Sequence, residues 1–90
     1  MKTYILDGKE MTGRKKMHAY LKEQFSFPDY YGNNMDAFWD CMTEKHPGNI
    51  VIINADSANQ RVVTSLIRVL LLLCRKHPKW TLEVKTGTEQ

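Results

Sequence analysis

Three short runs along the chain have the hydrophobic pattern of β-strands. The first covers residues 2–6 and ends at the turn dipeptide Asp7-Gly8. The second, at residues 49–54, contains a continuous β-branched run, which is typical of a strand covered on both faces in a parallel sheet. The third, at residues 80–85, alternates apolar and polar side chains, as a half-buried edge strand does. The second run is the most apolar, so we expect it to be the central strand.

Between these runs, the pattern of apolar positions predicts helices over residues 12–25, 34–43 and 57–77. Thr12 is the expected N-cap of the first helix, and Asn33 or Asn34 is that of the second. We expect an early break in the third helix around residues 58–59. The order β-α-α-β-α-β requires helical crossovers between the strands. It therefore predicts an α/β fold with a small three-stranded parallel sheet packed against helices.

The chain has 90 residues, the length of one domain, and its 42% hydrophobic and 26% charged residues are ordinary for a globular protein. We therefore expect a single domain over residues 1–90. The amino-terminal segment lacks the pattern of a signal peptide, and no run approaches the roughly 20 apolar residues of a membrane span. A cytoplasmic location without membrane association is expected. Cys41 and Cys74 have no zinc-binding or redox spacing and lie among apolar neighbours, which predicts two reduced, buried thiols.

Charge is distributed unevenly along the chain. The formal net charge is +3, from 13 basic and 10 acidic residues. The segment from Glu23 to Glu44 contains five of the acids and no Lys or Arg, so it carries −5 and the rest of the chain carries +8. The basic residues outside this segment are mostly scattered, which argues against a nucleic-acid partner because such a partner needs a clustered basic face.

The second predicted helix has an acidic side and an apolar side. At about 100° per residue, one sector of it carries Asp36, Asp40, Thr43 and Glu44. The opposite sector carries Met35, Phe38 and Met42. Trp39 lies at the border, so its ring can pack inward while one edge flanks the acids. Asp36 and Asp40 repel each other at a spacing of four residues, and such a pair is either ordinary solvated surface or a site for a cationic partner.

The loop before this helix contains two adjacent tyrosines. Pro28 stiffens the loop, and Gly32 permits a positive φ or a close backbone approach. Tyr30 and Tyr31 cannot both be buried easily in such a loop, so we expect one exposed ring and one ring that pins the loop to the core. Exposed tyrosine beside tryptophan and carboxylates is typical of a protein–protein contact.

Residues 27–43, FPDYYGNNMDAFWDCMT, closely resemble the tyrosine loop and acidic helix of the barstar family, which are intracellular inhibitors of ribonucleases. The predicted element order resembles that of the family over essentially the whole chain. In the family, this helix and loop plug the active site of a small ribonuclease, which is cationic because it binds RNA phosphates. The resemblance therefore implies a 1:1 complex with a small basic microbial ribonuclease, as in toxin immunity, and no cofactor.

The resemblance also implies roles for individual residues. Asp40 matches the central carboxylate, which occupies the phosphate position of the ribonuclease site. Asp36 matches a second acid directed at the enzyme's basic residues, and Tyr30 matches the tyrosine that packs against its catalytic histidine. Further contact positions are matched by Gly32, Asn34, Trp39 and Thr43. We add the neighbouring Tyr31 and Glu44 to the expected ribonuclease-binding set.

Two features depart from the family pattern. The family's name-giving member is strongly acidic, whereas this chain is basic. The family also contributes an acid from its last long helix, and the corresponding segment here, residues 69–74, is wholly apolar. A helix that is apolar all round is either buried or part of an interface. We expect a monomer, with self-association through Leu70–Leu73 as the alternative.

Two other classes of function stay open at this point. One is a binding module of the same fold whose partner is not a ribonuclease. The other is an enzyme, with the Asp36 and Asp40 pair or Cys41 with a histidine as its chemistry. The three histidines, His18, His46 and His77, are expected at surface or cap positions. No glycine-rich phosphate loop or metal-ligand spacing is present, so the sequence favours an inhibitor without catalytic or metal site.

Overall fold

Three parallel strands form the sheet of this protein, whose computed structural model describes residues 1–87. The strands are β1 (Thr3–Asp7), β2 (Asn49–Ile53) and β3 (Thr81–Val84). Their order is β1-β2-β3, with Tyr4 paired to Ile50 and Ile50 paired to Leu82. The predicted parallel sheet with the second strand at its centre is confirmed.

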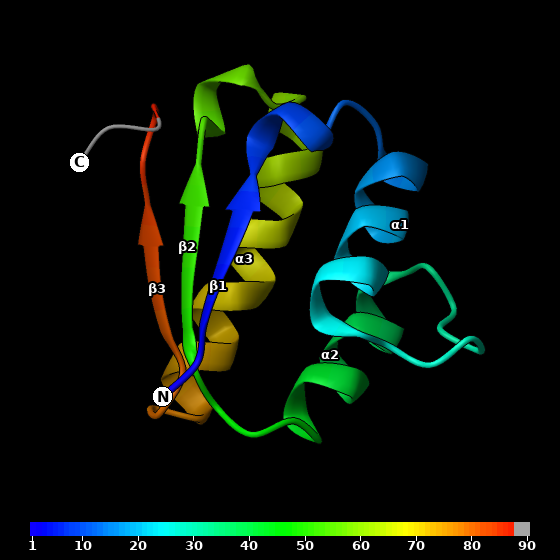
Figure 1. Ribbon diagram of the computed structural model, residues 1–90, viewed down its shortest axis with the longest axis vertical. Coiled ribbons are helices and arrows are strands. Elements are labelled where there is room, and N and C mark those ends of the chain that lie inside the picture. Colours follow the sequence, from blue (N-terminus) through cyan, green and yellow to red (C-terminus); the bar gives the residue numbers. More distant parts are fainter. Residues whose placement is uncertain (88–90) are drawn as a thin grey trace.

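The connections are helices, as the pattern predicted. They are α1 (Arg14–Phe25), α2 (Met35–Thr43) and α3 (Gln60–Lys76). Two short 3-10 turns, η1 (Gly8–Glu10) and η2 (Ala55–Ser57), follow the first two strands. Figure 1 shows α1, α2 and α3 on one side of the sheet. The predicted order β-α-α-β-α-β is confirmed, and η2 together with the cap residue Asn59 makes the early break expected in the third helix.

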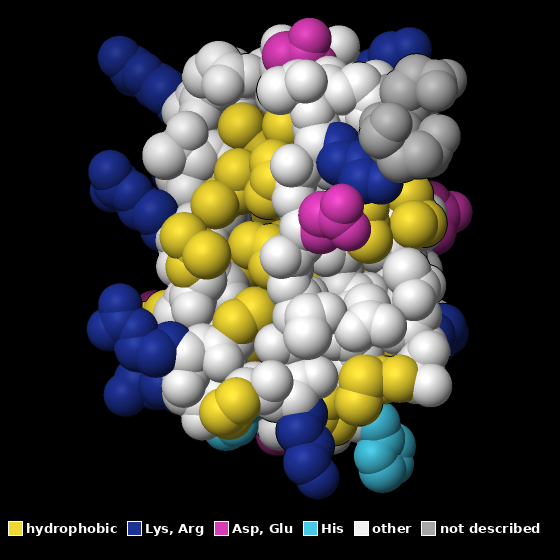
Figure 2. Space-filling model, turned by 90° about the vertical axis from the view of Figure 1, so that its left-hand side faces the viewer, with side chains coloured by type: hydrophobic (Ala, Val, Ile, Leu, Met, Phe, Trp, Pro, Cys, Tyr) yellow, Lys and Arg dark blue, Asp and Glu magenta, His cyan; other side chains and the backbone are white. Residues whose placement is uncertain are grey.

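The sheet is covered on one face, which corrects the prediction for the central strand. Exposure alternates along β2, where Ile50 and Ile52 are buried while Val51 is only half-buried. In β1, Leu6 is buried while Ile5 is exposed. Figure 2 shows hydrophobic side chains gathered in the middle of the face opposite the helices. The β-branched run therefore packs against helices on one side and reaches the surface on the other.

Helix α1 begins later than predicted. Its N-cap is Gly13, which supplies no side-chain hydrogen bond, and Thr12 is exposed before it. The preceding residues form η1, which the sequence did not indicate, because it packs against η2 from a distant part of the chain. A Cβ built on Gly8 would lie 2.1 Å from the Asn54 carbonyl oxygen, so this close approach requires glycine.

The apolar stretch in the last helix divides between core and surface. Leu70 and Leu73 are fully buried, whereas Leu71 is 57% exposed and Leu72 is also exposed. Of the two alternatives for this segment, burial is therefore correct for the side of α3 that faces the sheet, whereas Leu71 and Leu72 lie exposed on its outer side. Within residues 1–87, no helix is long and apolar enough to cross a membrane.

Candidate functional site

The local geometry of the site begins with the cap of α2. The Oδ1 of Asn34 accepts a hydrogen bond from the Ala37 amide at 2.8 Å, so the predicted capping role is confirmed. The Nδ2 of the same side chain donates to the Gly32 carbonyl at 3.2 Å. The positive φ of the loop falls on Asn33, at 56°, and not on Gly32. Neither role considered for Gly32 is seen, because its φ is not positive and the atoms nearest to a built Cβ belong to side chains, the Asn34 amide nitrogen at 3.3 Å and the Ala37 Cβ at 3.5 Å.

Helix α2 separates its acidic and apolar sides as its sequence predicts. Phe38 and Met42 are fully buried, and Met35 is partly buried against the same core. We call the exposed carboxylates of the opposite side, Asp36, Asp40 and Glu44, the acidic ridge. None of the three takes part in an ion pair or a side-chain hydrogen bond within residues 1–87. The ridge is therefore unneutralised by the part of the chain that the structure describes.

The cations nearest in sequence are occupied elsewhere. The ammonium group of Lys45 donates to the Phe25 carbonyl at 2.8 Å, beyond the end of α1. Lys22 pairs with Asp29 at 3.6 Å, so one of the five acids of the negative segment has a partner. Neither lysine forms an ion pair with a carboxylate of the acidic ridge.

The two tyrosines of the loop have opposite environments. Tyr30 is 84% exposed, whereas Tyr31 is 5% exposed and packs against Phe27 with ring centroids 4.8 Å apart. This is the expected division between one exposed ring and one buried ring. The side chain of Tyr31 supports the loop from within and offers almost no surface to a partner, so its place in the expected binding set stays a prediction.

A buried histidine fixes Tyr31. The Nδ1 of His18 lies 2.6 Å from the Tyr31 hydroxyl, and the His18 side chain is almost fully buried. His18 was expected at the surface, so its burial is a correction. Burial, and next the charge of Arg14, lower the pKa of His18 below 6.5. Burial is also the main cause that raises the pKa of Tyr31, so both groups are neutral at neutral pH.

A hollow of about 400 Å³ adjoins the acidic ridge. Asp40 and Glu44 line one part of it, and Tyr30, Pro28 and Phe27 line another. It therefore combines carboxylates with an apolar and aromatic wall, and Lys45, whose ammonium group donates to the Phe25 carbonyl, also lines it.

The remaining members of the expected set lie around the ridge. The Trp39 ring is half-buried and lies 6.1 Å from the His77 ring, and thus stands at the border of the two sides of α2 as predicted. The Oγ1 of Thr43 donates to the Asp40 carbonyl at 3.0 Å, so this hydroxyl stabilises the end of the helix. The structure brings Tyr30, Trp39 and the acidic ridge together on one loop–helix unit.

Both cysteines are unpaired, as expected, but each is half-buried rather than enclosed in the core. Burial raises the pKa of Cys41, and the charges of Glu44 and Asp40 add to the effect. Burial likewise raises the pKa of Cys74. No group of His, Cys, Asp and Glu side chains in residues 1–87 is arranged to hold a metal ion.

Two comparisons with known proteins bear on this site. The family model described as Barstar (barnase inhibitor) matches residues 1–83, which include the loop and α2. The chain is also 46% identical over 43 residues to "Putative ribonuclease inhibitor YrdF" of Bacillus subtilis (strain 168). That match covers 48% of this chain and 47% of the relative, so the chain spans about half the length of this relative.

Proposed function

Because the chain belongs to the barstar (barnase inhibitor) family, we propose that it inhibits a small basic ribonuclease by placing its acidic ridge and Tyr30 in the enzyme's cationic active site. Asp40, midway along the ridge, takes the position of an RNA phosphate among the enzyme's cations. Asp36 and Glu44 bind basic residues on either side, and Tyr30 packs against the catalytic histidine. The complex has one inhibitor to one enzyme and forms in the cytoplasm, before the ribonuclease leaves the cell.

One observation carries this proposal: three exposed carboxylates on one helix side have no ion-pair or hydrogen-bond partner within residues 1–87. Left in water, such charges repel each other, and cationic groups of a partner relieve the repulsion. The exposed ring of Tyr30 and the half-buried ring of Trp39 add amphipathic area beside the charges. In protein–protein interfaces, the few residues that carry most of the binding free energy form hot spots, which are rich in tyrosine and tryptophan.

The basic net charge affects how the partners meet. A chain of +3 gives a basic ribonuclease no overall attraction at long range. Attraction therefore depends on the local field of the acidic ridge, which acts over about 10 Å at moderate salt. Helix α3 adds no acid to this field between residues 69 and 74, so α2 supplies the charge of the contact almost alone.

The site supports binding rather than catalysis. The half-buried thiol of Cys41 makes no hydrogen bond to a histidine among the described residues, and the ring nitrogen Nδ1 of His18 is occupied by Tyr31. A thiol nucleophile needs an adjacent oriented base, and raised pKa values keep the thiols of this chain protonated. We therefore propose no enzymatic activity.

The test is a titration of the purified protein into a small basic microbial ribonuclease, with RNA cleavage as the readout. We expect cleavage to stop near one equivalent. The matched control is the isosteric double variant Asp36→Asn/Asp40→Asn, which keeps the shape of the ridge and should not inhibit at the same concentration. Tight binding that leaves RNA cleavage intact would instead favour the alternative of a binding module with a partner outside the ribonucleases.

A further inference from the structure

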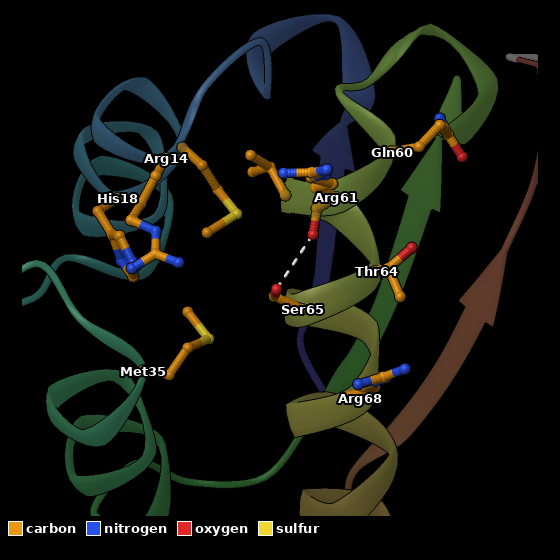
Figure 3. Close-up of a pocket in the computed structure, with 10 residues that line it drawn as sticks. Arg14, His18, Met35, Gln60, Arg61, Thr64, Ser65 and Arg68 are labelled. Atoms are coloured by element: carbon orange, nitrogen blue, oxygen red, sulfur yellow. Dashed lines mark hydrogen bonds between the residues drawn. The ribbon is translucent and has the colours of Figure 1, made fainter.

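A second cleft, of about 580 Å³, lies between α1 and α3 (Figure 3). No residue of the acidic ridge lines it. The beginnings of three helices meet there, because its lining includes Arg14 of α1, Met35 of α2 and Arg61 of α3. Sites for small molecules in proteins commonly have volumes of about 300–1,000 Å³. The cleft thus has room for a small ligand.

The charge of this cleft is entirely positive. Arg14, Arg61 and Arg68 line it, and no Asp or Glu does. None of the three guanidinium groups forms an ion pair or a hydrogen bond with another of residues 1–87. A guanidinium group offers its donors in a planar fork that matches phosphate oxygens, so three of them without partners favour an anion.

The helix ends increase this positive potential. The first turns of α1 and α3 contain no acidic residue, and α1 has no side-chain cap for its amide groups, whereas Asn59 Oδ1 accepts from the first amides of α3. The amino-terminal end of a helix carries partial positive charge, so arginines placed there are unfavourable in the free protein. An anion in the cleft would relieve that repulsion and would accept hydrogen bonds from the guanidinium groups. Asp36, in the first turn of α2, does not line the cleft.

A buried polar group also borders the cleft. His18 is 2% exposed and uses Nδ1 for Tyr31, while its Nε2 makes no hydrogen bond within residues 1–87. No side-chain nitrogen or oxygen sealed inside the described part of the chain lacks a partner, so Nε2 keeps a small accessible area, and His18 is among the residues that line the cleft. Figure 3 shows the guanidinium group of Arg14 beside the His18 ring. A neutral imidazole nitrogen at this place can form a directional hydrogen bond with a ligand.

The remaining lining gives the cleft an apolar part. Met17 of α1 and Met35 of α2 both line it. Thioether side chains adapt to flat apolar or aromatic groups. The cleft therefore pairs a cationic side, formed by three arginines, with an adaptable apolar side.

We propose that this cleft binds a small phosphorylated molecule with a flat apolar body, of the size of a mononucleotide. The phosphate lies between Arg14 and Arg61, near the beginnings of α1 and α3. The body of the ligand lies against Met17 and Met35. The site is independent of the acidic ridge, so its test does not depend on ribonuclease inhibition.

The test is binding measured by calorimetry and by amide chemical shifts, with adenosine 5′-monophosphate, inorganic phosphate and adenosine as separate probes. We expect the nucleotide to bind more tightly than either part, and to shift amides of residues 14–18 and 60–68. Arg14→Gln/Arg61→Gln should weaken nucleotide binding by at least about tenfold, because charge-assisted hydrogen bonds are lost. Arg75→Gln removes the same group from the last turn of α3, away from the cleft, and should leave binding unchanged.

Several outcomes would overturn the proposal. These are no shift with any probe at millimolar concentration, equal affinity for nucleotide and inorganic phosphate, or an equal loss in the Arg75→Gln control. Binding of single-stranded RNA without binding of the mononucleotide would indicate a nucleic-acid surface instead. Thermal unfolding of each variant verifies that it folds. If the double variant does not fold, Arg68→Gln replaces it, because Arg68 is exposed. We expect this single variant to weaken nucleotide binding several-fold.

Discussion

The hydroxyl of Tyr31 lies 2.6 Å from Nδ1 of His18, and this buried hydrogen bond links the tyrosine loop to α1. The two residues are thirteen positions apart, and their ring centroids are separated by 5.7 Å. Because Tyr31 is held inward, its neighbour Tyr30 points outward next to the acidic ridge. The exposed tyrosine of the site thus depends on a histidine whose own side chain is almost fully buried.

Stability is expected to decrease as the pH falls below 6.5. The pKa of His18 is lower in the folded protein than its ordinary value of 6.5, because burial and Arg14 disfavour the charged ring. As the pH falls, the ring of His18 is protonated at a higher pH in the unfolded chain than in the folded protein. The contribution of neutral His18 to the free energy of unfolding is therefore fully present above pH 6.5 and is lost as the pH falls through the folded pKa. Urea unfolding from about pH 5 to 8 measures this dependence.

The matched comparison for this prediction uses two histidine variants. His18→Gln should flatten the dependence below pH 6.5, whereas His46→Gln, at an exposed position, should preserve it. An unchanged slope in His18→Gln would show that another group causes the pH dependence.

Removal of the Tyr31 hydroxyl should destabilise the fold. In Tyr31→Phe the ring packing is kept, but Nδ1 of His18 loses its partner in a buried place. An unsatisfied buried polar group costs about 1–3 kcal/mol in the free energy of unfolding. Tyr30→Phe, the same change at an exposed ring, should alter stability by less than about 0.5 kcal/mol. Equal effects of the two changes in chemical denaturation would contradict the importance of the His18 contact.

Asp40→Ala should separate binding from stability. The free protein should stay within about 0.5 kcal/mol of the parent, because an exposed carboxylate that repels Asp36 is replaced by a good helix former. Binding to the ribonuclease should weaken by about 2–5 kcal/mol, since cations of the partner would remain desolvated and unpaired. Calorimetric binding and chemical denaturation of the same variant give the two numbers.

Two further variants allow the loss of binding in Asp40→Ala to be compared with other positions. Asp36→Ala should weaken binding less than Asp40→Ala and should also cost the fold a little, because Asp36 lies in the favourable first turn of α2. Lys15→Ala, on the exposed side of α1, should change neither quantity. If Asp40→Ala inhibits like the parent, the acidic ridge is ordinary solvated surface.

Tyr30→Ala should act on the lifetime of the complex. Because its ring is exposed in the free protein, truncation should not change the free energy of unfolding measurably. The complex would lose aromatic contact area, which acts mainly on dissociation, so we expect faster dissociation with a nearly unchanged association rate. Surface plasmon resonance measures both rates, and a change confined to association would contradict this role.

The cysteines should be reduced and slow to react. Both thiols are free and half-buried, and burial raises the pKa of each, so little thiolate exists at neutral pH. A thiol reagent should titrate two groups in the denatured protein without reductant, and both should react slowly in the native protein. A native rate equal to that of a free cysteine would contradict the environment described for Cys41 and Cys74.

The acidic ridge could be predicted from the sequence because helical geometry fixes it locally. Once Asn34 caps α2, the rotation per residue places Asp36 and Asp40 opposite Phe38, whatever the rest of the chain does. The strand order followed in a similar way from the apolar runs and the helical crossovers. The acidic ridge depends on few, short-range interactions, whereas the strand order joins distant segments and was predicted from the apolar character of the second run.

The errors concern contacts between distant segments. His18 is polar in any hydropathy pattern, and its burial depends on the hydroxyl of Tyr31, whose position no local rule gives. The β-branched run of β2 is compatible with one covered face or with two, and only the placement of all helices on one side decides between them. The basic cleft was missed for the same reason, because Arg14 and Arg61 are far apart in sequence.

The amide of Asn34 has a consequence for the kinetics of recognition. Its Nδ2 donates to the Gly32 carbonyl and its Oδ1 accepts from the Ala37 amide, so one side chain ties the end of the tyrosine loop to the first turn of α2. An ordered segment of this kind loses conformational entropy when the chain folds and not when a complex forms. For the proposed complex with a ribonuclease, we therefore expect orientation during diffusion, rather than rearrangement of the loop, to limit the rate of association.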